Sequence, residues 1–140
     1  MPYHFYRPAN TKYSNSQWLW DSGSHMITWA RRNVSNAVLD LRTMVQMQDP
    51  NTGFIPEMIY WNSSAPPGDR PPFDRHSAIS QMPVLAFSLR AICNATAADG
   101  GGGFGSESRD GVLAEFLPKL ISYWKWWSAE RDVRGAGLVR

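Results

Sequence analysis

The sequence predicts an all-α protein made of two consecutive antiparallel helical hairpins. Four segments carry apolar residues at the i, i+3, i+4 and i+7 spacing that is typical of helices with a buried face. Segments rich in proline, glycine, asparagine and serine separate the first two of these helices from the last two. No strand pattern competes with the helical one, so two consecutive helical hairpins joined by loops are expected.

The composition is that of one globular domain of 140 residues with a formal net charge of +2. Because no basic stripe occurs, nucleic acid is not expected as a partner. The single cysteine cannot form an intrachain disulfide, and the three histidines are too scattered for metal-ligand spacing, so no metal or cofactor is expected. No signal peptide or membrane-spanning stretch is recognised, which predicts a cytoplasmic protein with no membrane contact.

The first helix is expected to follow an extended arm over residues 1–16. It runs from about Trp18 or Asp21 to Arg32, whose charge complements the negative end of the helix dipole. Gly23 costs this helix about 1 kcal/mol relative to alanine. Either another segment approaches the backbone closely at this glycine, or the helix begins after it.

The second helix completes a first hairpin over residues 17–48. Asn33 or Ser35 caps it, and the short break before it forces the two helices to be antiparallel neighbours. Turn-forming residues 49–53 end the helix. Its apolar positions are Val34, Ala37, Val38, Leu41, Met44 and Val45.

Residues 49–79 are expected to connect the two hairpins without forming a helix. Residues 54–61 are apolar but interrupted by a proline, which suits an extended segment, and Glu57 would need a polar partner if it were buried there. Residues 62–76 are rich in turn formers and predict a long surface loop in which His76 is solvated.

The second hairpin is expected over residues 80–131. Ser80 can cap its first helix, with Pro83 in the first turn. Cys93 on this helix is interpreted as a small buried apolar residue. The glycine-rich residues 99–105 form a linker to the next helix, because they lack the lysine and hydroxyl residues of a phosphate-binding loop.

The last expected helix extends from about residue 107 to residue 131. Pro118 either kinks it or starts a second piece. Residues 132–140 begin the next connection. Three tryptophans near the end of this last helix are expected to pack against the core rather than serve as sugar platforms: Trp124, Trp126 and Trp127.

The motif at residues 17–25 is the best candidate for a binding site. Trp18, Trp20, Asp21 and His25 lie close together in it. A sugar can stack its C–H face on an indole and donate its hydroxyls to a carboxylate, which would satisfy the otherwise costly Trp–Asp neighbourhood. The alternative is an indole packed in the core with Asp21 as a helix N-cap. His25 either orients Asp21 or is a core histidine.

Four motifs follow one another in an order that resembles the catalytic domain of glycoside hydrolase family 63, a group that contains mannosylglycerate hydrolases, glucosylglycerate hydrolases and processing α-glucosidases. The motifs are Gln17-Trp18-Leu19-Trp20-Asp21-Ser22 with His25, Gly53-Phe54-Ile55-Pro56 with Met58-Ile59, Ser80-Gln81 with Pro83-Val84-Leu85-Ala86, and Pro118-Lys119-Leu120 with Trp126-Trp127. The resemblance covers nearly all of residues 12–140. It implies an incomplete portion of an (α/α)6 barrel of six helical hairpins.

The resemblance also implies roles for individual residues. Trp20 and Asp21 resemble the pair that lines the sugar subsite, and Gln81 resembles a glutamine that points into the same pocket. Glu57 departs from the family, which often has a histidine at that position, and so replaces a ring donor with an anion. The full set of expected substrate-binding residues is Trp18, Trp20, Asp21, His25, Glu57, Tyr60, Trp61 and Gln81.

The resemblance places the general acid and the general base beyond Arg140. An inverting glycosidase needs two carboxylates about 6.5 to 9.5 Å apart. The expected function is therefore a fragment of a glycoside hydrolase for a small glycoside, such as mannosylglycerate or glucosylglycerate, or for an oligosaccharide. The alternatives are a non-catalytic carbohydrate-binding or protein-docking module and a truncated product without independent function. Two hairpins of a barrel would also leave apolar faces open to self-association.

Overall fold

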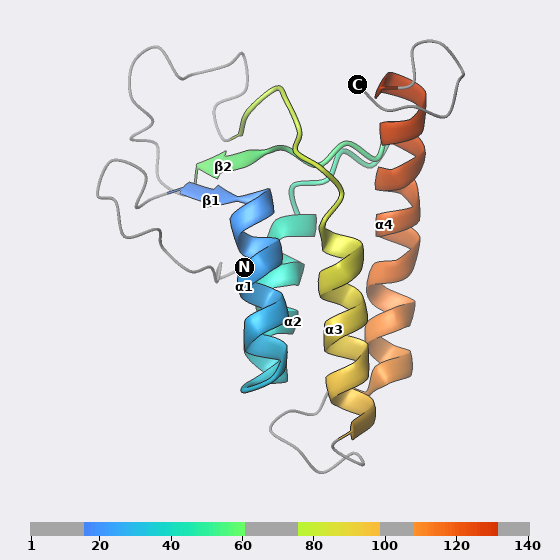
Figure 1. Cartoon of the computed structure of the whole chain (residues 1–140). Helices are drawn as coiled ribbons and strands as arrows, with labels where there is room; N and C mark the ends of the chain where they lie inside the picture. Colours follow the sequence, from blue (N-terminus) through green and yellow to red (C-terminus); the bar gives the residue numbers. More distant parts are fainter. Residues whose placement is uncertain (1–15, 61–75, 99–107, 132–140) are drawn as a thin grey trace.

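The protein is mostly helical, as the sequence predicts. The computed structural model describes residues 16–60, 76–98 and 108–131. The elements are β1 (Ser16–Trp18), α1 (Leu19–Ala30), α2 (Val34–Val45), β2 (Met58–Tyr60), α3 (Leu85–Ala98) and α4 (Arg109–Arg131). The four helices run side by side, and the two strands lie at the end of the bundle where α1 and α3 begin and α4 ends (Figure 1).

Several sequence predictions fall outside the described residues. These are the N-terminal arm, the long loop, the glycine-rich linker and the last connection, which correspond wholly or mostly to residues 1–15, 61–75, 99–107 and 132–140. Trp61 belongs to this group, so its placement at the site stays a prediction.

The first helical hairpin forms as expected. The Asn33 side chain accepts a hydrogen bond from the N–H of Asn36 at 3.1 Å, so it is Asn33 and not Ser35 that caps α2. Only residues 31–33 separate α1 from α2. A connection this short makes the two helices antiparallel neighbours.

Gly23 lies inside α1 because α3 approaches its backbone. A Cβ at this position would lie 2.6 Å from Cγ1 of Val84, and the Ser88 hydroxyl donates to the Gly23 carbonyl at 2.9 Å. Of the two explanations for this glycine, the close approach of another segment is confirmed. The glycine thereby sets how closely α3 packs on α1.

The expected cap of α3 is wrong. The helix begins at Leu85, and Ser80 lies in the segment before it. The Ser80 hydroxyl donates to the carbonyl of Ile55 at 2.5 Å and lies 2.6 Å from the hydroxyl of Tyr123. The Ser80 hydroxyl therefore bonds to residues distant in the sequence and does not cap the helix, because Ser80 is packed between the 46–57 connection and α4.

Helix α4 continues through Pro118, so of the two alternatives for this proline the start of a second piece is wrong. Proline removes the hydrogen bond to the carbonyl four residues earlier, which belongs to Ala114. Both Pro118 and Ala114 are exposed, so water can satisfy that carbonyl. The helix therefore tolerates its proline on the solvent side.

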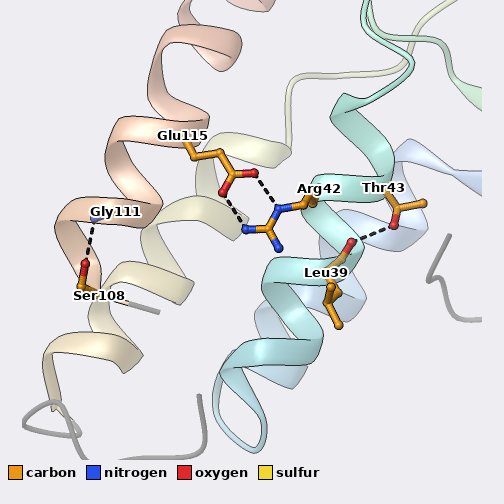
Figure 2. Close-up of polar contacts among 6 residues, drawn as sticks. All are labelled: Leu39, Arg42, Thr43, Ser108, Gly111 and Glu115. Atoms are coloured by element: carbon orange, nitrogen blue, oxygen red, sulfur yellow. Dashed lines mark hydrogen bonds and ion pairs between the residues drawn. The ribbon is translucent and has the colours of Figure 1, made fainter. Parts of the chain in front are cut away.

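A bidentate ion pair joins α2 to α4. Nε and Nη2 of Arg42 donate to the two carboxylate oxygens of Glu115, each at 2.6 Å (Figure 2). Hydrogen bonding from Arg42 lowers the pKa of Glu115. Both side chains are about one third exposed, so solvent screens the pair and its contribution to stability is modest.

The core lies among the four helices and is closed at one end by Ile55 and Ile59. Cys93 is buried, as expected. Trp127 is buried and Trp126 packs against the core, but Trp124 is 56% exposed, so the packing predicted for it is wrong. The largest fully buried apolar side chains are Leu19, Met26, Leu41, Met44, Ile55, Ile59, Leu85, Ile92, Phe116 and Tyr123.

A two-stranded antiparallel sheet closes the end of the bundle, and β2 lies in the segment 54–61 that the sequence predicts to be extended. Each strand has three residues, too few to show an alternating pattern in the sequence. The pairs are Ser16 with Tyr60, Gln17 with Ile59 and Trp18 with Met58. His76 forms an isolated bridge to Ile59 and is half-buried, so its predicted solvation is wrong.

Candidate functional site

The candidate site is built around the first turn of α1. The N-cap position of α1 is Trp18, whose side chain cannot cap the helix, and the first N–H groups need other acceptors. The N–H of Leu19 donates to the carbonyl of Glu57 at 2.8 Å, and the N–H of Trp20 donates to Oε1 of Gln81 at 2.7 Å. Two distant segments therefore cap this helix in place of its own sequence.

Trp20 and Asp21 face outward at this capped end. Trp20 is 46% exposed, Asp21 is exposed, and neither belongs to the core. Asp21 lies in the first turn and not at the N-cap. The alternative of a core indole with a capping aspartate is thus wrong, and both side chains are open to a ligand.

Glu57 is linked to Trp20 through the side chain of Gln81. Nε2 of Gln81 donates to Oε1 of Glu57 at 3.4 Å, while the other end of the same amide accepts from Trp20. The N–H of Glu57 donates to the carbonyl of Ile79 at 2.8 Å, which fixes its backbone. Glu57 is half-buried, so the need for a polar partner that the sequence indicated is met by Gln81.

Helix α4 holds the backbone of Gln81 from the other side. The Tyr123 hydroxyl donates to the Gln81 carbonyl at 2.6 Å, and Nε1 of Trp127 donates to the same oxygen at 3.0 Å. Burial raises the pKa of Tyr123, so its hydroxyl keeps its proton as a donor. These two buried donors hold the backbone carbonyl of Gln81. Its side-chain amide extends in the other direction, toward Trp20 and Glu57.

Sequence reasoning missed Tyr123 as a residue that supports the site. It lies four residues before Trp127, so the two share a face of α4. The sequence could have indicated this role. It places a tyrosine and a tryptophan at that spacing, and each has a polar group that needs a hydrogen-bond partner when it is buried. Trp126 extends this aromatic group, since its ring is nearly parallel to that of Tyr123 at a centroid distance of 6.1 Å.

The Gln17 side chain points away from the site into the core. It is 1% exposed, and its Nε2 donates to Oδ1 of Asp40 on α2 at 2.7 Å. Burial raises the pKa of Asp40 to about 8, with the Gln17 bond opposing the rise. Asp40 is therefore mostly neutral at pH 7. Sequence reasoning missed it, although an acidic residue among the apolar positions of α2 was a visible signal.

The other expected site residues that the structure describes are half-buried or buried. Trp18 is half-buried on β1, next to β2, where Tyr60 is 7% exposed. His25 is half-buried one turn after Asp21. The structure thus links Trp20 and Glu57 through hydrogen bonds to the side chain of Gln81, and Trp61 lies outside the described residues.

Neither a metal site nor a membrane helix is found in the part of the chain that the structure describes. No three histidine, cysteine, aspartate or glutamate side chains among residues 16–60, 76–98 and 108–131 are grouped so that they could hold a metal ion. Within the same ranges, no helix has the length and apolar character needed to cross a bilayer.

Known proteins similar to this chain are glycoside hydrolases. The family model described as the mannosylglycerate hydrolase MGH1-like glycoside hydrolase domain matches residues 13–140. Mannosylglycerate hydrolase MGH2 of Selaginella moellendorffii is 28% identical over 135 residues, and MGH1 of the same organism is 27% identical over 137. Each match covers 88% of this chain but 25% of the relative, so the chain spans about a quarter of their length.

Solved structures show the same relation. The GH63 mannosylglycerate hydrolase of Thermus thermophilus in complex with Tris has a TM-score of 0.72 and 25% sequence identity, over 96% of this chain and 32% of that chain. The same enzyme in complex with glucose gives a TM-score of 0.67 at 22% identity, over 89% of this chain and 30% of that chain. The helical fold seen here is therefore a portion of that larger one.

Proposed function

Because this chain belongs to the family of mannosylglycerate hydrolase MGH1-like glycoside hydrolase domains, we propose that it forms part of the sugar-binding site of a glycoside hydrolase. One observation carries the proposal: a single amide, that of Gln81, joins the backbone of Trp20 to the carboxylate of Glu57 beside an exposed indole. Polar groups held in place beside an exposed ring have the chemistry that a sugar requires.

Each side chain has a role in this proposal. The exposed indole of Trp20 stacks on the C–H face of a sugar ring, and the Asp21 carboxylate accepts hydrogen bonds from its hydroxyls. Gln81 donates or accepts with an amide that its bonds to Trp20 and Glu57 already orient. Glu57 adds a second carboxylate that can accept hydrogen bonds from the hydroxyls of the sugar. Trp18, His25, Tyr60 and Trp61 complete the proposed wall.

The proposed reaction is hydrolysis with inversion of a small glycoside, such as mannosylglycerate or glucosylglycerate, or of an oligosaccharide. Support for this substrate class comes from the relatives, which are mannosylglycerate hydrolases, and from the Thermus enzyme, whose structures hold glucose in one case and Tris with D-glycerate in another. We place the acid and base carboxylates in a part of the domain other than these 140 residues. The cytoplasmic location expected from the sequence belongs to the same proposal.

Calorimetric titration with mannosylglycerate and glucosylglycerate tests the binding role. We expect saturable binding to the 140-residue chain, its loss in Asp21→Asn, and its retention in Asp110→Asn. Asp110 is the matched control because it is also an exposed aspartate in the first turn of a helix, but α4 begins at the opposite end of the bundle (Figure 1).

Two results would contradict the proposal. Equal binding by the wild type and Asp21→Asn would remove the sugar site from this end of α1. Hydrolysis of either glycoside by the purified 140-residue chain would contradict the placement of the acid and base outside it, because the reaction needs both carboxylates.

A further inference from the structure

The Gln81 amide bonds to two partners at once, which leaves it little freedom of position. Its Oε1 accepts from the N–H of Trp20 at 2.7 Å, and its Nε2 donates to Oε1 of Glu57 at 3.4 Å. The second distance is near the upper limit for an N–H···O hydrogen bond, so a small displacement of the amide would break that bond. The position of the amide therefore depends on how firmly the backbone of Gln81 is held.

No helix or strand fixes the backbone of Gln81, because this residue lies in the connection between β2 and α3. Two residues earlier, the Ile79 carbonyl accepts from the N–H of Glu57 at 2.8 Å. The carbonyl of Gln81 itself lies 2.6 Å from the Tyr123 hydroxyl and 3.0 Å from Nε1 of Trp127. The carbonyl carbon and Cβ are both bonded to the Cα of Gln81, so bonds that hold the carbonyl restrict the direction in which the side chain leaves the backbone.

The Tyr123 hydroxyl also reaches the connection that carries Glu57. Its oxygen lies 2.6 Å from Oγ of Ser80. The Ser80 hydroxyl donates to the carbonyl of Ile55 at 2.5 Å, two residues before Glu57. One oxygen on α4 is therefore part of a chain of contacts that runs from Gln81 to the segment of its partner Glu57.

The surroundings of Tyr123 hold that oxygen in place. The Tyr123 side chain is 1% exposed, and Nε1 of Trp127 donates to its hydroxyl at 2.9 Å. Trp127 is buried as well, so both groups are shielded from competing water. Trp127 keeps its own bond to the Gln81 carbonyl when the Tyr123 hydroxyl is removed. Loss of that hydroxyl is therefore expected to loosen the site without abolishing it.

We propose that Tyr123 is a positioning residue of the sugar site. Its hydroxyl holds the Gln81 carbonyl directly and the segment of Glu57 through Ser80. The Gln81 amide is thereby aimed at Trp20 and at the bound sugar. The role toward the sugar rests on the proposed function, whereas the link from Tyr123 to Trp20 can be tested without a sugar.

Amide hydrogen exchange tests the link to Trp20. Tyr123→Phe removes the hydroxyl and keeps the ring. Relative to exchange in the centre of α3, which reports global unfolding, it is expected to make exchange at the Trp20 N–H about fivefold faster, the effect of about one hydrogen bond. Equal relative rates at Trp20 in the wild type and Tyr123→Phe would overturn the inference.

Thr43→Val is the matched control for this measurement. Thr43 is 4% exposed, and its hydroxyl donates to the Leu39 carbonyl at 2.8 Å within α2 (Figure 2). The variant therefore also removes one buried hydroxyl that bonds to a backbone carbonyl, but away from the sugar site. It should leave the relative exchange rate at Trp20 unchanged, and a fivefold acceleration in this control as well would overturn the inference.

A double-mutant cycle tests whether Tyr123 acts on the sugar through Gln81. Affinities for mannosylglycerate and glucosylglycerate are measured by nuclear magnetic resonance titration, which is suited to weak binding. Tyr123→Phe is expected to weaken binding about fivefold in the wild-type chain, and not to weaken it further in Gln81→Ala, whose backbone carbonyl is intact. A merely structural role would cost the same affinity in both backgrounds. That result, or unchanged affinity in Tyr123→Phe, would overturn the inference.

A second variant covers the case in which Tyr123→Phe does not fold. Ser80→Ala breaks the contact between Tyr123 and Ile55 without loss of a ring, and it should make exchange at Trp20 about threefold faster. Unchanged exchange in Ser80→Ala would then overturn the inference. A wild-type chain that binds neither glycoside would disprove the proposed function, and exchange at Trp20 would still decide whether Tyr123 positions Gln81.

Discussion

Two glutamines near the start of α1 have opposite roles. Gln17 on β1 is fully buried and bonds to a buried carboxyl group, so its amide ties a strand to α2. Gln81 precedes α3 and is half-buried, with its carbonyl fixed by α4 and its amide turned toward an exposed tryptophan. The comparison teaches that the same side chain joins two elements inside the core in one case, and in the other joins two segments beside an exposed indole, where we propose that the sugar binds.

Loss of the Tyr123 ring should have the largest effect on this comparison. Tyr123→Ala removes a side chain that is 1% exposed together with its bond to the Gln81 carbonyl. We expect the free energy of unfolding to fall by about 3 to 5 kcal/mol, measured by urea denaturation. Trp124→Ala, on the exposed side of the same helix, should cost less than about 1 kcal/mol. Similar losses in the two variants would show that Tyr123 does not anchor this end of the bundle.

The buried pair of Gln17 and Asp40 should make the free energy of unfolding depend on pH. The pKa of Asp40 is 3.8 ordinarily and about 8 in the folded protein, so between these values the folded state keeps a proton that the unfolded state releases. Stability from this group is therefore complete below about pH 4 and falls by about 1.4 kcal/mol per pH unit as the pH rises toward 8.

The matched variant for that prediction is Asp40→Asn, which keeps the shape and cannot titrate. Urea denaturation from about pH 5 to about pH 8 should show the wild type losing stability relative to Asp40→Asn as the pH rises. Asp110→Asn, at an exposed carboxylate, should run parallel to the wild type. Parallel profiles for the wild type and Asp40→Asn would mean that Asp40 is ionised in the folded protein.

Removal of the Gln81 amide should have a smaller effect that is confined to the site. Gln81→Ala leaves the Trp20 N–H without its acceptor, which is comparable to the loss of a helix cap, at about 1 kcal/mol. Amide hydrogen exchange at Trp20 should become faster, and exchange in the centre of α2 should not change. Gln46→Ala, at an exposed glutamine on the end of α2, is the control. Unchanged exchange at Trp20 would disprove the capping role.

Truncation of Trp20 should have the smallest effect on stability and a full effect on binding. Trp20 is 46% exposed, so Trp20→Ala is expected to change the free energy of unfolding by less than about 0.5 kcal/mol. Binding of mannosylglycerate and glucosylglycerate should nevertheless be lost, whereas Trp124→Ala should bind as the wild type does. Retained sugar binding in Trp20→Ala would remove the stacking role from the proposal.

Local patterns in the sequence predicted the helices, because a helix depends on residues that are only three or four positions apart in the sequence. The spacing of Val34, Ala37, Val38 and Leu41 marks the buried face of α2, and Asn33 caps that helix through a residue three positions away. The same reasoning failed for Ser80. Ser80 could cap a helix by its type alone, but a carbonyl of the preceding connection and a tyrosine of α4 compete for its hydroxyl.

The sequence by itself determined the four helices, the first hairpin and the order of motifs that identifies the family. Only the tertiary structure decided which polar groups meet. The bond between Trp20 and Gln81 spans 61 residues of sequence and the one between Gln17 and Asp40 spans 23, distances over which no periodic pattern carries information. Tertiary packing also decided which side chains are buried. It leaves Trp20, Trp124 and an apolar groove between α3 and α4 exposed to solvent, and it encloses Asp40, which keeps its proton as a result.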